Sequence, residues 1–162
     1  MAKSVVPTEP CDCAEVPASR LRLSVPGVRG DRVKERGTLD GMAIKLFNTH
    51  YEWSVGFDTA SIAYDPDVTY KVRVRVRVEK ESAAKGEACW AGVYDRVAKK
   101  GYGSISVKAE RCGDGYAWYD VCKWKPRDGQ YFWLGPGRFK KNGGVSAIKS
   151  VWVDRIEISR VD

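Results

Sequence analysis

The clearest pattern along the chain is the alternation of valine and basic residues over positions 70–78, YKVRVRVRV. One set of alternate positions is Val72, Val74, Val76 and Val78, and the other is Lys71, Arg73, Arg75 and Arg77. Successive side chains of a β-strand point to opposite faces, so the pattern predicts a strand with a buried valine face and a basic face in water. An α-helix would spread the same residues around its whole circumference.

Shorter patterns of the same kind, bounded by Gly, Pro, Asn or Asp, occur along most of the chain. We predict strands at 20–25, 42–47, 51–57, 70–78, 88–94, 103–110, 116–124, 130–134 and about 150–160. Asp114-Gly115 before 116–124 is a hairpin signal, because glycine readily takes the positive φ of such a turn. About nine short strands with Gly/Pro turns and no convincing helix predict an all-β fold, a two-sheet antiparallel β-sandwich of the jelly-roll type.

The length of 162 residues fits one domain. Residues 1–18 carry Pro7, Pro10 and Pro17 without any hydrophobic period, so we predict a flexible tail or linker there and the sandwich domain over 19–162. No apolar run approaches the roughly 18 residues of a membrane span, so no membrane partner is expected. The first residues also lack the apolar core of a signal peptide. The protein is therefore expected to be either intracellular or a piece of a longer, exported protein.

Charge and metal-binding residue types narrow the chemistry further. The net charge of +7 attracts polyanions, among them nucleic acid, acidic polysaccharide and anionic lipid. The only histidine is His50, which excludes a multi-histidine metal centre. Five cysteines, an odd number without a CxxC pair, do not predict a zinc site, and at least one has no partner within the chain.

Three segments together resemble the galactose-binding-like jelly roll of many carbohydrate-binding modules. The segments are 39–46 (LDGMAIKL) followed by 53–55 (WSV), 70–77 (YKVRVRVR) and 151–158 (VWVDRIEI). They are similar to the early strands, the long central strand and the closing strand of these modules. The likeness covers roughly residues 20–162.

The resemblance implies a non-catalytic polysaccharide-binding module attached to a neighbouring catalytic domain of a larger carbohydrate-active enzyme. It also implies a secreted or periplasmic location as part of that protein. The same sandwich can instead serve only as a structural brace for its neighbour, so that reading stays open.

The basic face of 70–78 offers a candidate binding surface. Arg73, Arg75 and Arg77 would lie about 7 Å apart, and guanidinium groups bind carboxylates and sulfates in bidentate fashion. This spacing suits a uronic-acid or sulfated glycan. The alternative is a solvated strand face whose charge only discourages aggregation.

The aromatic strand at 116–124 offers a second candidate surface. Burying Asp120 unpaired would be costly, so we predict that Trp118, Asp120 and Trp124 face outward and bind a sugar. In the opposite register both tryptophans would lie in the core, and that alternative stays open. The same question applies to Trp133 against Phe132.

Asp154 is the candidate metal ligand. It is expected to point inward, and in the resembling modules the matching aspartate often helps to hold a structural calcium ion. No other cofactor is expected. The alternative is that Asp154 accepts hydrogen bonds from backbone amides.

Catalysis has little support in the sequence, so we expect no enzyme activity. Tyr94 and Arg96 could serve as base and uronate ligand of a lyase, while His50 reads as a loop-edge residue. Nucleic-acid binding through phosphate contacts and base stacking is the remaining alternative, although no recognisable RNA-binding motif is present.

Overall fold

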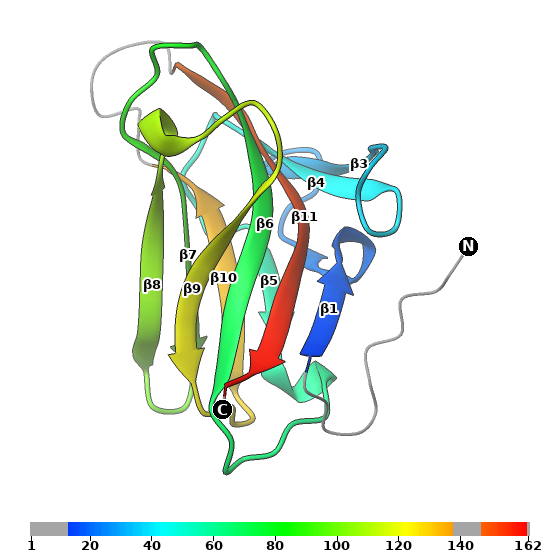
Figure 1. Cartoon of the computed structure of the whole chain (residues 1–162), viewed down its shortest axis with the longest axis vertical. Helices are drawn as coiled ribbons and strands as arrows, with labels where there is room; N and C mark the ends of the chain where they lie inside the picture. Colours follow the sequence, from blue (N-terminus) through cyan, green and yellow to red (C-terminus); the bar gives the residue numbers. More distant parts are fainter. Residues whose placement is uncertain (1–12, 138–146, 162) are drawn as a thin grey trace.

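The structure is a computed structural model that describes residues 13–137 and 147–161. In these two described ranges, eleven strands form two antiparallel sheets that face each other (Figure 1). Sheet A contains, in spatial order, β3 (Gly30–Lys34), β4 (Met42–Phe47), β11 (Ile148–Arg160), β6 (Tyr70–Lys80) and β9 (Ala117–Trp124), and β1 (Cys13–Pro17) also pairs with β11. Sheet B contains β2 (Arg22–Leu23), β5 (Val55–Asp58), β10 (Gln130–Pro136), β7 (Glu87–Asp95) and β8 (Lys100–Lys108).

Short turns connect some of these strands. Within the described residues, three single turns of 3-10 helix lie at Ala18–Arg20, Thr59–Ser61 and Ala109–Arg111. No helix in the part of the chain that the structure describes is long and apolar enough to cross a membrane. The two facing antiparallel sheets confirm the predicted jelly-roll sandwich.

The core lies between the sheets, as the alternation at 70–78 predicts. Val72, Val74, Val76 and Val78 of β6 are 0%, 0%, 1% and 3% exposed. They pack with Val153 and Ile156 of β11 and with Phe132 and Leu134 of sheet B. Each fully buried valine stabilises the fold by about 1.5–3 kcal/mol relative to an exposed one. β6 thus supplies a continuous buried face to sheet A, between the central strand β11 and the edge strand β9.

The predicted tail is wrong where it overlaps the first strand. Residues Cys13–Pro17 form β1, whose backbone pairs with Arg155 to Ser159, and Ala14 and Val16 are buried. The pattern was missed because only two inward side chains in this short strand reach the core. β3 was also missed, since its sequence GDRVK has no apolar alternation. Residues 1–12 of the predicted tail lie outside the described part.

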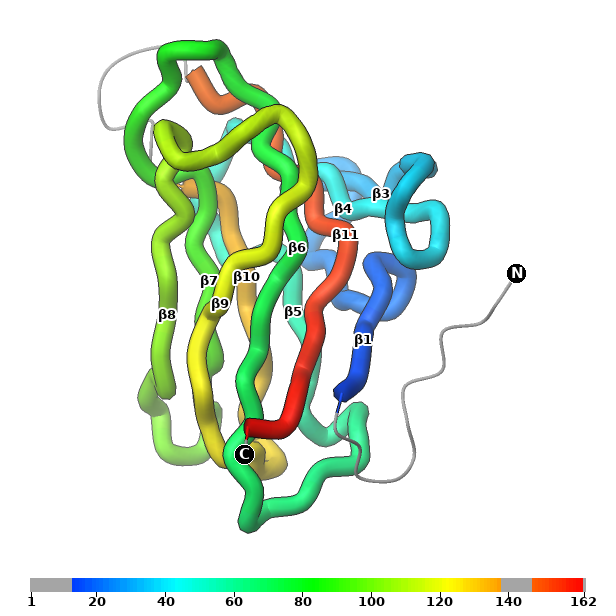
Figure 2. Tube along the Cα trace, viewed as in Figure 1, coloured from blue at the N-terminus to red at the C-terminus, as the bar shows by residue number. Residues whose placement is uncertain are grey.

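β11 exchanges one neighbour for another along its length. Its residues 150–153 pair with β4, and its residues 155–159 pair with β1 on the same edge (Figure 2). On the opposite edge β6 runs beside both halves, with a register shift between Val153 and Arg155. Asp154 is the extra residue in this β-bulge, and a bulge reverses the face on which the following residues point.

Candidate functional site

Five aromatic side chains gather on the outer face of sheet B, away from the core. Trp90 and Tyr94 come from β7, Tyr131 and Trp133 from β10, and Trp53 from the segment just before β5. We call these five residues the aromatic cluster. The indoles of Trp53 and Trp133 stack with their centroids 4.3 Å apart and their planes 11° from parallel. Trp90 meets the Trp133 ring edge-on at 4.7 Å, and Tyr94 meets Tyr131 at 5.8 Å.

Glycines in the neighbouring strands make room for this stack. In the register of sheet B, Trp133 lies between Gly56 of β5 and Gly92 of β7. A Cβ atom at Gly92 would lie 2.6 Å from Cζ2 of Trp133 and 2.7 Å from the carbonyl oxygen of Gly103. The indole therefore lies flat over Gly92, and it is buried although it points away from the core.

The segment that carries Trp53 is held by the only histidine. The backbone N–H of Glu52 donates to Nδ1 of His50 over 3.1 Å, so Nδ1 must be unprotonated. Nε2 then carries the proton and donates to the carbonyl oxygen of Arg29 over 2.7 Å. Nη1 of Arg29 donates in turn to the carbonyl oxygen of Trp53. The predicted loop-edge histidine thus fixes the position of a stacking tryptophan.

Two cavities share Trp53 in their lining. One has a volume of ≈ 210 Å³, and its lining includes Arg22, Arg96, Trp53, Ser54, Tyr131 and Trp133. The other has a volume of ≈ 330 Å³ and is lined by Tyr51, Glu52, Trp53 and Trp90. We call this pair of cavities and the aromatic cluster the aromatic cleft. Apolar ring surface beside a few polar groups is the usual make-up of a ligand site.

Positive charge accompanies the aromatic rings in the smaller cavity. The guanidinium of Arg96 lies 4.5 Å from the ring centroid of Tyr131, within the range of a cation–π contact. Arg22 and Arg96 both bind Asp58, at 3.2 Å and 3.1 Å. Burial raises the pKa of Tyr131 above its ordinary value, so its hydroxyl stays protonated and can donate a hydrogen bond at neutral pH.

The three arginines of the predicted row lie where the sequence places them, but they are not free to bind a ligand. Arg73, Arg75 and Arg77 point outward from β6, on the opposite side of the molecule from the aromatic cleft. Their ion-pair partners are Glu157 at 2.6 Å, Asp154 at 2.6 Å and Glu35 at 2.9 Å, respectively.

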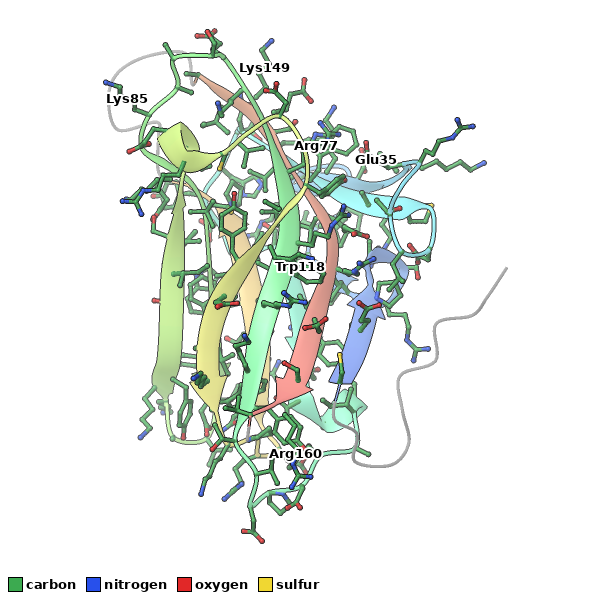
Figure 3. The ribbon with its side chains drawn as sticks, viewed as in Figure 1. Glu35, Arg77, Lys85, Trp118, Lys149 and Arg160 are labelled. Atoms are coloured by element: carbon green, nitrogen blue, oxygen red, sulfur yellow. The ribbon has the colours of Figure 1, made fainter. Side chains whose placement is uncertain are left out.

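These guanidiniums also lie over aromatic rings of the same face. Arg73 lies 4.1 Å from the ring of Trp118, and Arg77 lies 4.3 Å from the ring of Trp152. Arg77 and Glu35 appear side by side in Figure 3, with Trp118 further along the same sheet. Each arginine therefore already has a carboxylate of this chain.

The strand carrying Trp118 and Trp124 is where the predicted surface fails. Trp118 and Asp120 face outward beside Arg75 and Arg73, as predicted. Trp124 is only 5% exposed and lies in the core, which contradicts the prediction that it faces outward. The cause is a register shift at Val121, an extra residue in β9 that reverses the alternation. The two tryptophans consequently do not form one platform.

The same kind of bulge governs Asp154. Plain alternation would place it on one face with Trp152 and Ile156, but the bulge sends Trp152 outward and Ile156 into the core. Asp154 is fully buried, but its carboxylate meets Arg75 on the outer side of sheet A and does not point into the core as expected. Its Oδ2 accepts from Nη1 of Arg75 at 2.6 Å, and its Oδ1 accepts from the backbone N–H of Leu39 at 2.9 Å.

These contacts do not fit a calcium site at Asp154. Both carboxylate oxygens already accept hydrogen bonds, and the nearest charged partner is a guanidinium cation, which would repel a metal ion. Among residues 13–137 and 147–161, no group of three or more His, Cys, Asp or Glu side chains could hold a metal. The amide-accepting role, which the sequence left open as the alternative, is the one observed.

Sequence reasoning missed most of the aromatic cleft. Tyr94 and Arg96 were considered only as lyase residues, and the orientation of Trp133 was left open. Phe132 points into the core and Trp133 away from it, which resolves that question. A usable signal was present: Gly56 and Gly92 interrupt otherwise apolar strands, and interior strand glycines often mark close approach of another group.

Comparison with known proteins identifies the fold of this chain but no family of related sequences. A scan against protein-family models finds no match, and a search of curated protein sequences finds none. Solved structures do match. The CBM22-1 xylan-binding domain of Xyn10C from Paenibacillus barcinonensis aligns with a TM-score of 0.58 and 9% identity, covering 96% of this chain and 98% of that one.

Two further structures give a similar result. The CBM6cm-2 carbohydrate-binding module of lichenase 5A from Cellvibrio mixtus, solved with cellotriose, aligns at a TM-score of 0.55 and 10% identity, over 92% of this chain and 98% of that one. The C-terminal CBM6 of LamC from Zobellia galactanivorans aligns at 0.54 and 10%, over 91% and 98%. At these identities the likeness shows the jelly-roll fold of carbohydrate-binding modules.

Proposed function

We propose that this protein is a non-catalytic carbohydrate-binding module and that its glycan site is the aromatic cleft on sheet B. The observation that carries the proposal is the pair of cavities that share Trp53. Aromatic rings line both cavities, and arginine and hydroxyl groups line the smaller one. The jelly-roll fold shared with xylan-binding and cellotriose-bound modules supports it.

The chemistry of the cleft suits a sugar chain. A pyranose ring has an apolar C–H face that packs on an aromatic ring, while its hydroxyl groups need hydrogen-bond partners. Trp53 offers indole surface to both cavities, and Tyr131 and Arg96 offer donors beside it. Because Trp53 lines both cavities, neighbouring sugar units of one chain could contact the same indole. The site is thus suited to more than one sugar unit of a polysaccharide.

Acidic glycans are the preferred class within this proposal. The net charge of +7 favours polyanions, and both charged residues lining the smaller cavity are arginines. The arginine row of β6 is a poorer candidate for the same ligand, because carboxylates of this chain already pair with it.

The module is proposed to act as part of a larger carbohydrate-active enzyme outside the cytoplasm. Support comes from a structural neighbour of that arrangement, the CBM22-1–GH10 modules of Clostridium thermocellum Xyn10B, complexed with xylohexaose. It aligns at a TM-score of 0.55 and 12% identity, over 100% of this chain and 29% of that one. A module of this kind would keep a catalytic domain close to its polymer.

The proposal is tested by isothermal calorimetry against xylan, cello-oligosaccharides, mixed-linkage glucan, mannan, polygalacturonate and alginate. Trp53→Ala removes the ring shared by both cavities and is expected to weaken binding at least about tenfold, as for other central aromatic contacts. Trp118→Ala is the matched control, because it removes an indole from the opposite face.

Two results would overturn the proposal. Heat with none of these glycans would leave a structural sandwich, the alternative that the sequence left open. Binding that survives Trp53→Ala but is lost in Trp118→Ala would move the site to sheet A.

A further inference from the structure

The smaller cavity of the aromatic cleft has an unusual charge distribution. Its two charged lining residues are Arg22 of β2 and Arg96 at the turn after β7, and no carboxylate lines it. Both side chains are about half exposed, at 48% and 52%. Cations that border a cavity and remain partly hydrated can exchange water for an anion at little desolvation cost. The cavity thus combines ring surface with positive charge.

One carboxylate serves both arginines. Nη1 of Arg22 and Nη2 of Arg96 bind Asp58, which leaves one positive charge uncompensated within this group of three. A guanidinium carries five N–H donors, so each arginine keeps donors for a further acceptor. Asp58 therefore holds the two cations together without neutralising them.

Local packing fixes where Arg22 lies. A Cβ atom at Gly56 would be 2.7 Å from Nη2 of Arg22, so the guanidinium lies directly over this glycine. Gly56 is also the register partner of Trp133. The cation is thereby placed at the edge of the aromatic cluster, and Arg96, held over Tyr131, lines the same cavity.

The arginines of sheet A differ in each of these respects. Arg73, Arg75 and Arg77 have separate carboxylate partners, and their side chains are only 31%, 23% and 21% exposed. That face is neutral pair by pair. An external anion would have to displace a bound carboxylate on sheet A. At Arg22 and Arg96 it would meet one positive charge that no carboxylate of the group balances.

We propose that the cavity between Arg22 and Arg96 is a subsite for an anionic substituent of the bound polysaccharide, a uronate carboxylate or a sulfate ester. The inference rests on the proposed glycan-binding function and adds the chemical group that this cavity selects. The anion accepts hydrogen bonds from the guanidinium groups while the adjoining sugar ring packs on the aromatic cluster. Selectivity comes from the second charge, which Asp58 does not cancel.

The test uses polymer pairs that differ only in charge. Glucuronoxylan and polygalacturonate are each compared with their carboxyl-reduced forms, and dextran sulfate with dextran, by calorimetry at low and at physiological salt. The variants are Arg22→Gln and Arg96→Gln. Lys85→Gln is the control for net charge, because Lys85 lies in the β6–β7 connection, at the opposite end of β7 from Arg96 (Figure 3).

We expect an acidic polymer to bind at least about tenfold more tightly than its neutral partner. Each arginine variant should lose about five- to thirtyfold in affinity for the acidic form, with a weaker salt dependence, and a clearly smaller factor for the neutral form. Lys85→Gln should bind like the parent protein. The uronate and sulfate arms identify which anion the subsite takes.

Three results would overturn the inference. If acidic and neutral forms bind equally and the arginine variants change neither, the anionic subsite is refuted while glycan binding stands. If all three lysine and arginine variants lose the same affinity, the attraction is non-specific. If no polysaccharide binds, or if single-stranded DNA alone binds through Arg22 and Arg96, the glycan proposal fails as well.

Discussion

Substituting Gly92 by alanine tests whether the aromatic cluster is built as described. The new methyl group would start 2.6 Å from Cζ2 and 2.9 Å from Cε2 of Trp133, and 2.7 Å from the carbonyl oxygen of Gly103. The carbonyl belongs to the backbone paired with Val93, so relieving that contact strains the β7–β8 ladder. The indole must move as well, and Trp53 stacks on it.

The expected cost follows from that geometry. Overpacking of a closed site costs typically about 1–3 kcal/mol, which for a domain of this size lowers Tm by roughly 2–10 °C. Because Trp53 must move with Trp133, glycan affinity should fall about tenfold in the same variant. Urea unfolding followed by tryptophan fluorescence measures the first effect, and calorimetry measures the second.

Gly101→Ala is the matched control. The nearest atom to a Cβ at Gly101 is the carbonyl oxygen of Val93 at 3.8 Å, an ordinary contact, so stability should change by less than about 0.5 kcal/mol. If Gly92→Ala is as stable as Gly101→Ala and binds glycan normally, Trp133 does not lie over Gly92. The argument for the cleft would then lose its structural basis.

Three further predictions concern other parts of the molecule. Arg75→Met removes the nearer of the two described cations from the buried carboxylate of Asp154 and leaves Arg155, at 3.6 Å, so it should cost about 3 kcal/mol in chemical denaturation, and added calcium or a chelator should leave the Tm of the parent protein unchanged. Burial raises the pKa of the Cys122 thiol to about 11. The buried neutral thiol therefore contributes to the free energy of unfolding at neutral pH, and this contribution is lost as pH rises from about 9 to 11. Cys122→Ala should therefore show a shallower alkaline loss of Tm. Asp58→Asn removes the carboxylate that pairs with Arg22 and should raise affinity for acidic glycans about two- to fivefold, with no change expected for neutral ones.

Most strands could be predicted because their own sequences show which side chains are buried. The valines of β6, and the runs that became β4, β7 and β10, bury one face and show it in the sequence. β1 and β3 could not be predicted, because β1 has two inward residues and β3 pairs at an edge with mostly exposed side chains. β1 pairs with β11 at the other end of the chain, whereas β3, among the described strands, is held only by the next strand, β4.

The predicted binding surface failed for a more specific reason. One extra residue at Val121 and another at Asp154 reverse the alternation in β9 and β11, and nothing in either strand signals a bulge. Trp124 consequently turned into the core and Trp152 turned outward. Period-two reasoning is reliable only up to the first bulge, because a shift of one residue exchanges the two faces.

The aromatic cleft could not be assembled from the sequence at all. Its rings come from β7, β10 and the segment before β5, which the sandwich topology places side by side although they are up to 80 positions apart. The arginines likewise come from β2 and from the turn after β7. The sequence does contain one sign of the cleft, because Gly56 and Gly92 lack the side chains that would occupy the space of the rings.

The six tryptophans allow one direct measurement of where a glycan binds. Their indole N–H signals can be followed by two-dimensional NMR while an acidic polysaccharide fragment is titrated into labelled protein. We expect the signals of Trp53, Trp90 and Trp133 to shift, while those of Trp118 and Trp152 on sheet A and of Trp124 in the core stay in place. Shifts of Trp118 and Trp152 with an unchanged Trp53 signal would contradict the account.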